Sequence, residues 1–116
     1  MKDRKKELRE QYKNMKTEMG VFIIRSTSGS KCLLTATPNL KGGMNRARFQ
    51  LSAGSHPCKE LQKEWLQLGA SHFVIETLEV LEYDKDESKT DYSEDLDLLK
   101  MIWEDKLIKQ GKEFYQ

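Results

Sequence analysis

The sequence has few of the residues that mark a secreted, zinc-binding or membrane-spanning protein. Its 116 residues include two prolines and only two cysteines, Cys32 and Cys58. Two cysteines provide neither a disulfide framework nor a zinc-finger spacing. No apolar run of about 18 residues is present, and no apolar stretch of signal-peptide length follows the basic N-terminus. We therefore expect a reduced, cytoplasmic protein that has no membrane partner.

The near-neutral net charge of +1 conceals an uneven distribution along the chain. Residues 1–50 carry 12 Lys or Arg and 4 Asp or Glu, whereas residues 51–116 carry 8 and 15. A basic half can attract a polyanion such as nucleic acid, or it can attract the acidic half of the same chain. Apolar residues make up 37% of the chain and are patterned, which is typical of a folded domain.

Residues 1–19 predict a charged amphipathic helix. Leu8, Tyr12, Met15 and Met19 recur at intervals of 4, 3 and 4 residues and make one narrow apolar stripe. Such a helix needs a partner surface, because its intrinsic propensity leaves it only marginally stable. The stripe is expected to pack on the following domain. The alternatives are a mobile basic arm, or a stripe that mediates self-association or binds a protein partner.

A β-hairpin is predicted next. Residues 21–24 (VFII) and 32–37 (CLLTAT) have the composition of short strands, and Gly29 lies in the polar turn between them. Pro38 ends the second strand. Two short strands joined by a glycine-containing turn favour an antiparallel pair.

The region after the hairpin is harder to interpret. Gly42 and Gly43 argue against a helix through that point. Residues 44–51 therefore form either a short helix or an irregular loop, and the register of residues 38–54 stays open.

Two helices and one more strand are predicted in the second half. Pro57 stands at the start of a helix over about 57–68, which Gly69 ends. A third strand covers residues 72–81, and a last helix covers about 94–110 with Asp91 or Ser93 as its cap. The predicted class is α+β, a small three-stranded antiparallel sheet flanked by helices.

Residues 20–110 resemble the GIY-YIG nuclease domain family. Residues 20–22 (GVF) stand where the family has Gly-Ile-Tyr, and residues 33–35 (LLT) where it has Tyr-Ile-Gly. His56 lies in a turn before a helix, and Trp103 lies on the final helix, as in the family. The resemblance implies a GIY-YIG-like domain at 20–110, preceded by the extra helix at 1–19 and followed by a tail at 111–116.

The resemblance also implies an active site from which this sequence departs. In the family, two tyrosines and an arginine surround the scissile phosphate, and a glutamate on the last helix holds one divalent metal ion. The tyrosine positions hold Phe22 and Leu33, and the glutamate position holds Lys100, which cannot coordinate Mg²⁺. Arg46 is the nearest candidate for the arginine, and Met44 is an equally fair match.

These substitutions remove most of the catalytic machinery. We therefore expect a degenerate GIY-YIG protein, a pseudo-enzyme that needs no cofactor and retains DNA binding in a regulatory or accessory role. The first alternative is an active Mg²⁺-dependent endonuclease with relocated residues, in which Asp97 replaces the lost metal ligand. The second is a protein-interaction or dimerisation module that does not bind nucleic acid.

The expected nucleic-acid interface is a set of basic residues, because cations within reach of one groove neutralise phosphates. The set is Arg25, Lys31, Lys41, Arg46, Arg48 and Lys100. No phosphate-binding glycine loop and no nucleophile elbow is present. The two cysteines with His56 and His72 match no zinc-ligand spacing.

Overall fold

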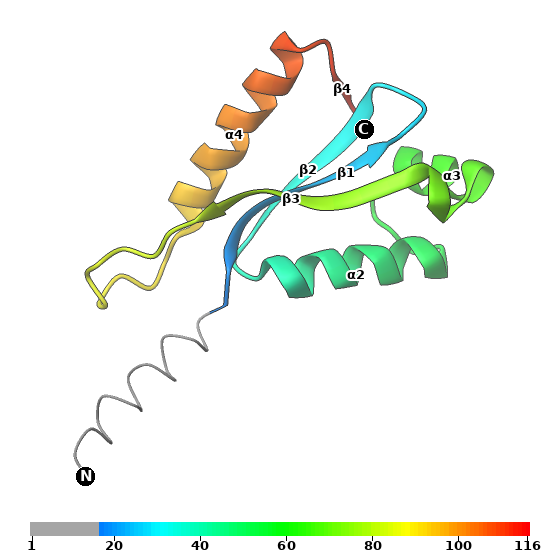
Figure 1. The fold of residues 1–116 in the computed structure, drawn as a ribbon. Helices are drawn as coiled ribbons and strands as arrows, with labels where there is room; N and C mark the ends of the chain where they lie inside the picture. The colour runs from blue at the N-terminus through cyan, green and yellow to red at the C-terminus, as the bar shows by residue number, and fades with distance from the viewer. Residues whose placement is uncertain (1–16) are drawn as a thin grey trace.

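The computed structural model describes residues 17–116, so the stripe of Leu8, Tyr12 and Met15 lies outside the described residues. Met19, the last residue of that predicted stripe, is the first residue of a strand instead. The described chain contains the following elements in order (Figure 1): β1 (Met19–Ser26), β2 (Lys31–Thr37), α2 (Leu40–Ala53), α3 (Lys59–Leu68), β3 (Phe73–Leu81), α4 (Ser93–Lys109) and β4 (Glu113–Phe114). None of these helices is long and apolar enough to cross a membrane.

The strands form one sheet of four, in the order β3-β1-β2-β4, rather than the predicted sheet of three. β1 pairs antiparallel with β2 and with β3, whereas β4 pairs in parallel with the start of β2. The prediction missed β4 because two residues are too few to show an alternating pattern. Its strand geometry depends on the pairing of Glu113 and Phe114 with Lys31 and Cys32.

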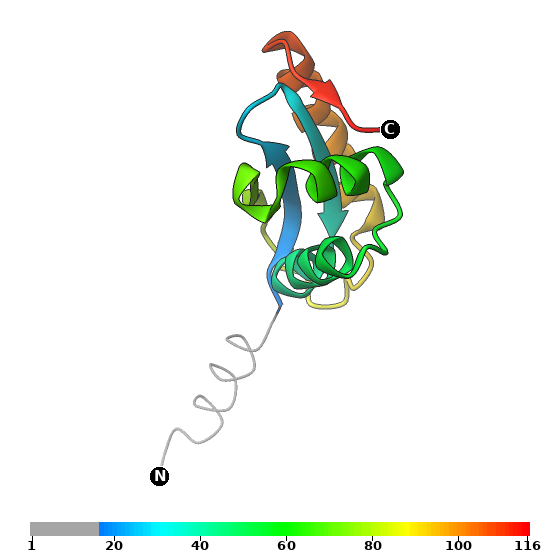
Figure 2. The ribbon, with the colours of Figure 1, turned by 90° about the vertical axis from the view of Figure 1, so that its right-hand side faces the viewer.

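Helices cover both faces of the sheet: α2 and α3 lie on one face and α4 on the other (Figures 1 and 2). On β1, Phe22 and Ile24 pack in the core beneath α2 and α3, while Val21 and Ile23 pack beneath α4. Because β1 is central and buried on both sides, its apolar residues are continuous rather than alternating.

The helix α2 runs through Gly42 and Gly43, contrary to the expectation that this pair interrupts a helix. The reason lies in the first turn. The Asn39 side chain caps the helix by accepting a hydrogen bond from the Gly42 backbone N–H (2.9 Å). A Cβ at Gly42 would lie 2.5 Å from the Asn39 amide nitrogen, so glycine leaves room for the cap. Burial of Leu40 and Leu51 then anchors the helix to the sheet.

Other element boundaries differ from the predictions by one or two residues. The helix α3 begins at Lys59 rather than at Pro57, and His72 belongs to a short 3₁₀ turn (Ala70–His72) before β3. The N-cap position of α4 is occupied by Tyr92, neither Asp91 nor Ser93, and the Tyr92 side chain makes no capping hydrogen bond. The Asp91 carboxylate instead accepts hydrogen bonds from the Ser93 backbone N–H and hydroxyl.

The predicted tail at 111–116 contributes to the core. Tyr115 is 4% exposed and packs with Phe22 and Ile24 in the core beneath α2 and α3. Its backbone N–H donates to the Cys32 carbonyl (3.0 Å), so pairing with β2 places the ring.

Candidate functional site

A cavity of about 520 Å³ lies between the β1–β2 hairpin and α2. In the strand pair, Phe22 lies opposite Thr35, so both side chains face α2. Leu33, two residues before Thr35, is on the same face. The lining residues are Phe22, Leu33, Thr35, Ala36 and Thr37 from the strands, Gly43, Arg46, Ala47 and Gln50 from α2, and His56, Pro57 and Cys58 from the turn before α3.

The turn before α3 is held by Gln62, a buried polar residue that no sequence pattern indicated. Its side-chain oxygen accepts from the His56 backbone N–H, and its side-chain nitrogen donates to the Leu51 carbonyl, both at 2.9 Å. These two bonds join the end of α2 to the start of α3. They fix His56 and Cys58 at the cavity wall.

His56 presents an N–H donor to its surroundings. The backbone N–H of Cys58 donates to His56 Nδ1 (3.0 Å), so Nδ1 carries no proton. The neutral ring therefore has its proton on Nε2. Burial lowers the pKa of His56 from its ordinary value of 6.5, which keeps the ring neutral at pH 7.

The two threonine hydroxyls on the cavity floor differ in whether they make hydrogen bonds within the protein. Thr37 Oγ1 accepts from the Asn39 backbone N–H (3.1 Å) and lies 3.2 Å from the Asn39 carbonyl, so it is committed to the turn before α2. The Thr35 hydroxyl makes no hydrogen bond within residues 17–116. It is the free hydroxyl beside Phe22.

The lining of the cavity contains no carboxylate. Residues 17–116 also contain no group of three or more His, Cys, Asp or Glu side chains placed to hold a metal ion. Asp97, the candidate replacement ligand, is exposed on α4, on the opposite face of the sheet, and does not line the cavity. Divalent cations such as Mg²⁺ need oxygen ligands, usually carboxylates. The side chains present therefore do not fit the metal ion that the family resemblance implies.

The structure separates the predicted basic residues into two groups. Arg25 and Lys31 on the hairpin have acidic partners, Glu76 at 3.1 Å and Glu60 at 3.2 Å. Lys100 is half-buried on α4 and does not line the cavity. The charges of Arg25 and Lys31 are therefore paired, and Lys100 lies away from the cavity.

The second group lies on α2 and has no acidic partner in the described part of the chain. Lys41, Arg46 and Arg48 are all exposed, and α2 itself contains no Asp or Glu. Arg46 reaches the cavity, whereas Met44 packs against the core. Lys41 and Arg48 are about two helical turns apart and share the outward face.

Phe49 on α2 was not singled out from the sequence, yet its side chain is 72% exposed. It follows Arg46 by three positions, so the two side chains are neighbours on the helix surface. The Arg-Ala-Arg-Phe run of residues 46–49 could have drawn attention to it, since an aromatic ring among cations is common in nucleic-acid-binding surfaces.

The two cysteines lie in different environments. Cys32 is 1% exposed, and burial raises the pKa of its thiol, an effect that Lys112 partly opposes. Cys58 is half-buried at the cavity wall. His72 is exposed in the 3₁₀ turn before β3.

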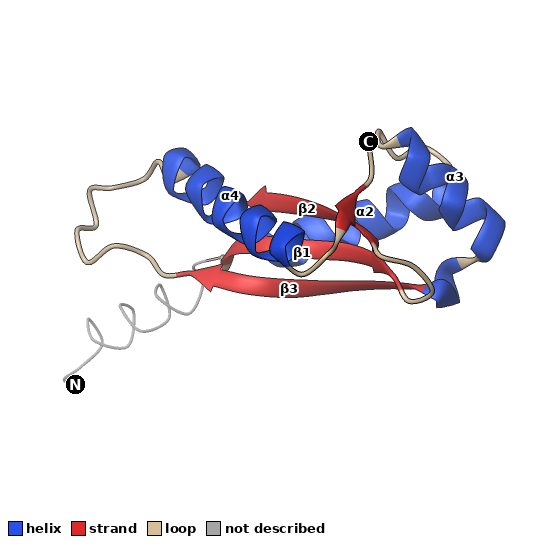
Figure 3. Ribbon diagram, turned by 90° about the horizontal axis from the view of Figure 1, so that it is seen from above, coloured by secondary structure: helices blue, strands red, loops and turns tan. Residues whose placement is uncertain are grey.

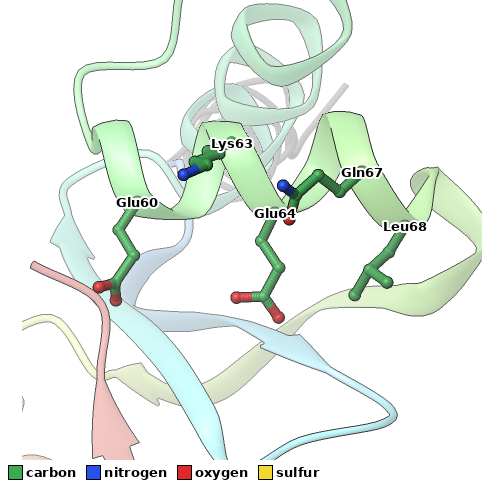
Figure 4. Close-up of a pocket in the computed structure, with 5 residues that line it drawn as sticks. All are labelled: Glu60, Lys63, Glu64, Gln67 and Leu68. Atoms are coloured by element: carbon green, nitrogen blue, oxygen red, sulfur yellow. The ribbon is translucent and has the colours of Figure 1, made fainter.

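A second cavity of about 420 Å³ runs along α3 (Figure 4) and is lined by Glu60, Lys63, Glu64, Gln67 and Leu68. The carboxylates of Glu60 and Glu64 point to the same side of the helix (Figure 4), and Glu60 is already paired with Lys31. This groove contains none of the predicted site residues. It does not compete with the first cavity as the candidate site.

The sheet order, the helices on both faces and the cavity against the first hairpin define a GIY-YIG-like α+β fold. The structure is similar to the catalytic domain of the homing endonuclease I-TevI, a GIY-YIG endonuclease, with a TM-score of 0.64. The sequences are 20% identical, and the match covers 84% of this chain and 98% of that domain.

A point variant of the I-TevI catalytic domain is also similar, with a TM-score of 0.52 and 23% identity over 70% of this chain and 86% of that one. No protein-family model matches the sequence, and neither does any curated protein sequence. The likeness to a GIY-YIG endonuclease domain is therefore one of fold.

Proposed function

We propose that this protein binds nucleic acid through the cavity and the basic face of α2, and that it does not cut the nucleic acid by metal-dependent hydrolysis. The observation that supports this proposal is the chemistry of the cavity lining. It offers several hydrogen-bond donors and no carboxylate. Such a lining suits an anion and does not suit a divalent cation.

A phosphodiester matches these donors. The Arg46 guanidinium carries a permanent positive charge and a planar set of donors that fits phosphate oxygens. The Nε2–H of His56 and the Thr35 hydroxyl add neutral donors on the opposite wall and the floor. Contacts of this kind position a nucleic-acid backbone without reading its sequence.

The outward face of α2 extends this surface. Lys41 and Arg48 are exposed without acidic partners in residues 17–116, and Phe49 offers a ring on which a base can stack. If α2 makes three phosphate contacts, the affinity for duplex DNA should fall about 40-fold when the salt concentration rises from 50 to 200 mM. Binding without cleavage suits a regulatory or accessory role.

The test is a titration of labelled duplex and branched DNA in Mg²⁺, followed by fluorescence anisotropy over a salt series. The end-point samples are then run on a denaturing gel. We expect salt-sensitive binding and intact DNA. Absence of binding at low salt would refute the nucleic-acid role, and Mg²⁺-dependent cleavage would refute the loss of catalysis.

A further inference from the structure

The outer face of α4 carries a stripe of large apolar side chains. Leu98, Met101, Ile102 and Ile108 are 58%, 63%, 43% and 59% exposed. At 3.6 residues per turn these four positions fall within about a third of the helix circumference. The opposite side of α4 is buried against the sheet by Leu96, Leu99 and Leu107. The helix is therefore apolar on two sides, and the sheet covers only one of them.

Nothing in the described part of the chain covers this stripe. Of the described helices, only α4 lies on its face of the sheet, with α2 and α3 on the other face (Figure 3). Single exposed apolar residues are ordinary on a protein surface, whereas a contiguous stripe marks an interaction surface.

The charges at the two ends of α4 indicate which partner fits. The first turn contains Glu94 and Asp95, and the last turn contains Lys106 and Lys109. Asp95 is paired with Lys89 and Lys109 with Asp105, so Glu94 and Lys106 are the charges of these two turns that have no ion-pair partner in residues 17–116. A two-fold axis perpendicular to α4 would set two copies of the helix antiparallel, with each acidic end against a basic end. The apolar stripes then meet in the middle. We propose that the outer face of α4 is a homodimer interface of this kind.

Two acidic residues share the angular range of the stripe, Glu94 at its start and Asp105 between Ile102 and Ile108. Asp105 is paired with Lys109 on its own helix, with 3.0 Å between carboxylate oxygen and ammonium. The carboxylate therefore does not enter the interface as an unpaired charge, which would oppose association.

The dimer leaves the proposed nucleic-acid surface free, because α2 and the cavity lie on the other face of the sheet (Figure 2). Each dimer would expose two copies of the basic face. The inference does not depend on the proposed function.

Sedimentation velocity of the full chain over a concentration series tests the proposal. We expect a dimer that dissociates on dilution, and Ile102→Lys or Leu98→Glu should raise the dissociation constant about tenfold or more. The matched control is Leu66→Glu, since Leu66 is 68% exposed on α3, and this change should leave the dimer intact. Protein interfaces of biological size associate at concentrations below about 200 μM. A wild-type protein that stays monomeric up to this concentration would overturn the proposal.

Charge exchange tests the antiparallel orientation. The variants Glu94→Lys and Lys106→Glu leave the Asp95–Lys89 and Asp105–Lys109 pairs intact. Each variant should dimerise severalfold more weakly than wild type, because like charges then meet at both ends. Mixing the two should restore a heterodimer. Unchanged self-association of both variants would overturn the antiparallel arrangement. Circular dichroism checks that each variant keeps its helix content.

The apolar residues predicted on 1–19 are the competing source of self-association. Tyr12→Glu in the full chain should leave the α4 dimer intact. If Tyr12→Glu abolishes the dimer while Ile102→Lys does not, the interface belongs to the N-terminal segment and the proposal fails.

Discussion

Phe22 lies directly opposite Thr35 in the antiparallel pair of β1 and β2, so a ring without a hydroxyl and a free hydroxyl are side by side on the cavity floor. The Cβ atoms of such a pair are about 5 Å apart. Phe22 is only 2% exposed and is therefore also a core residue. The floor supplies packing and one neutral donor, but no group for acid–base chemistry at neutral pH.

Restoring the two tyrosines of the GIY-YIG pattern should not produce a nuclease. Phe22→Tyr combined with Leu33→Tyr adds two hydroxyls to a cavity that still has no carboxylate for a metal ion. We expect plasmid nicking by this variant in Mg²⁺ or Mn²⁺ to equal the protein-free background. Nicking above the wild-type level would mean that a residue outside the cavity lining supplies the metal ligand.

Arg46→Ala should weaken DNA binding about five- to tenfold. It should also reduce the slope of log K against log salt by about 1, because one phosphate contact is lost. Anisotropy titrations at several salt concentrations measure both effects. The matched control is Lys85→Ala, since Lys85 is exposed in the acidic loop between β3 and α4. Equal losses from both substitutions would indicate a general charge effect rather than a contact at the cavity.

His56 should make stability depend on pH. Burial lowers its pKa in the folded state below 6.5, so the unfolded chain binds a proton first as the pH falls. The contribution is fully present above about pH 7 and is lost as the pH falls from 6.5 toward the lower folded-state pKa. Urea unfolding at pH 7.5 and 5.0 measures the difference.

His56→Asn is the matched variant for this experiment. Asparagine keeps an acceptor for the Cys58 backbone N–H and does not titrate. The variant should lose less stability than wild type between pH 7.5 and 5.0. An identical loss in both proteins would assign the pH dependence to other groups.

The two thiols should react at different rates. Cys58 is half-buried at the cavity wall, whereas Cys32 is buried and burial raises the pKa of its thiol. A neutral maleimide should label Cys58 first, and labelling of Cys32 should wait for unfolding. A bound oligonucleotide should slow the labelling of Cys58, as read by mass spectrometry. If the oligonucleotide binds but Cys58 labelling is unchanged, nucleic acid does not occupy the cavity.

Local patterns in the sequence were sufficient to predict most of the helices and strands. The runs at 21–24 and 32–37 lie within β1 and β2, and the apolar periodicity near 57–68 and 94–110 identified α3 and α4. These features depend on residues a few positions apart, and the conformation of such short segments is governed by apolar periodicity and turn chemistry. The order of the motifs around Phe22, Leu33 and Trp103 was also enough to indicate a GIY-YIG-like fold.

Contacts between distant parts of the chain decided the rest. Glu76 and Glu60 neutralise Arg25 and Lys31 across 51 and 29 positions, so the free basic surface moves from the hairpin to α2. Likewise β4 exists because the chain end returns to pair with β2, and the α4 stripe is exposed because no helix of residues 17–116 packs on it. Burial and ion pairing depend on which surfaces meet in three dimensions, and residue order alone does not specify those surfaces.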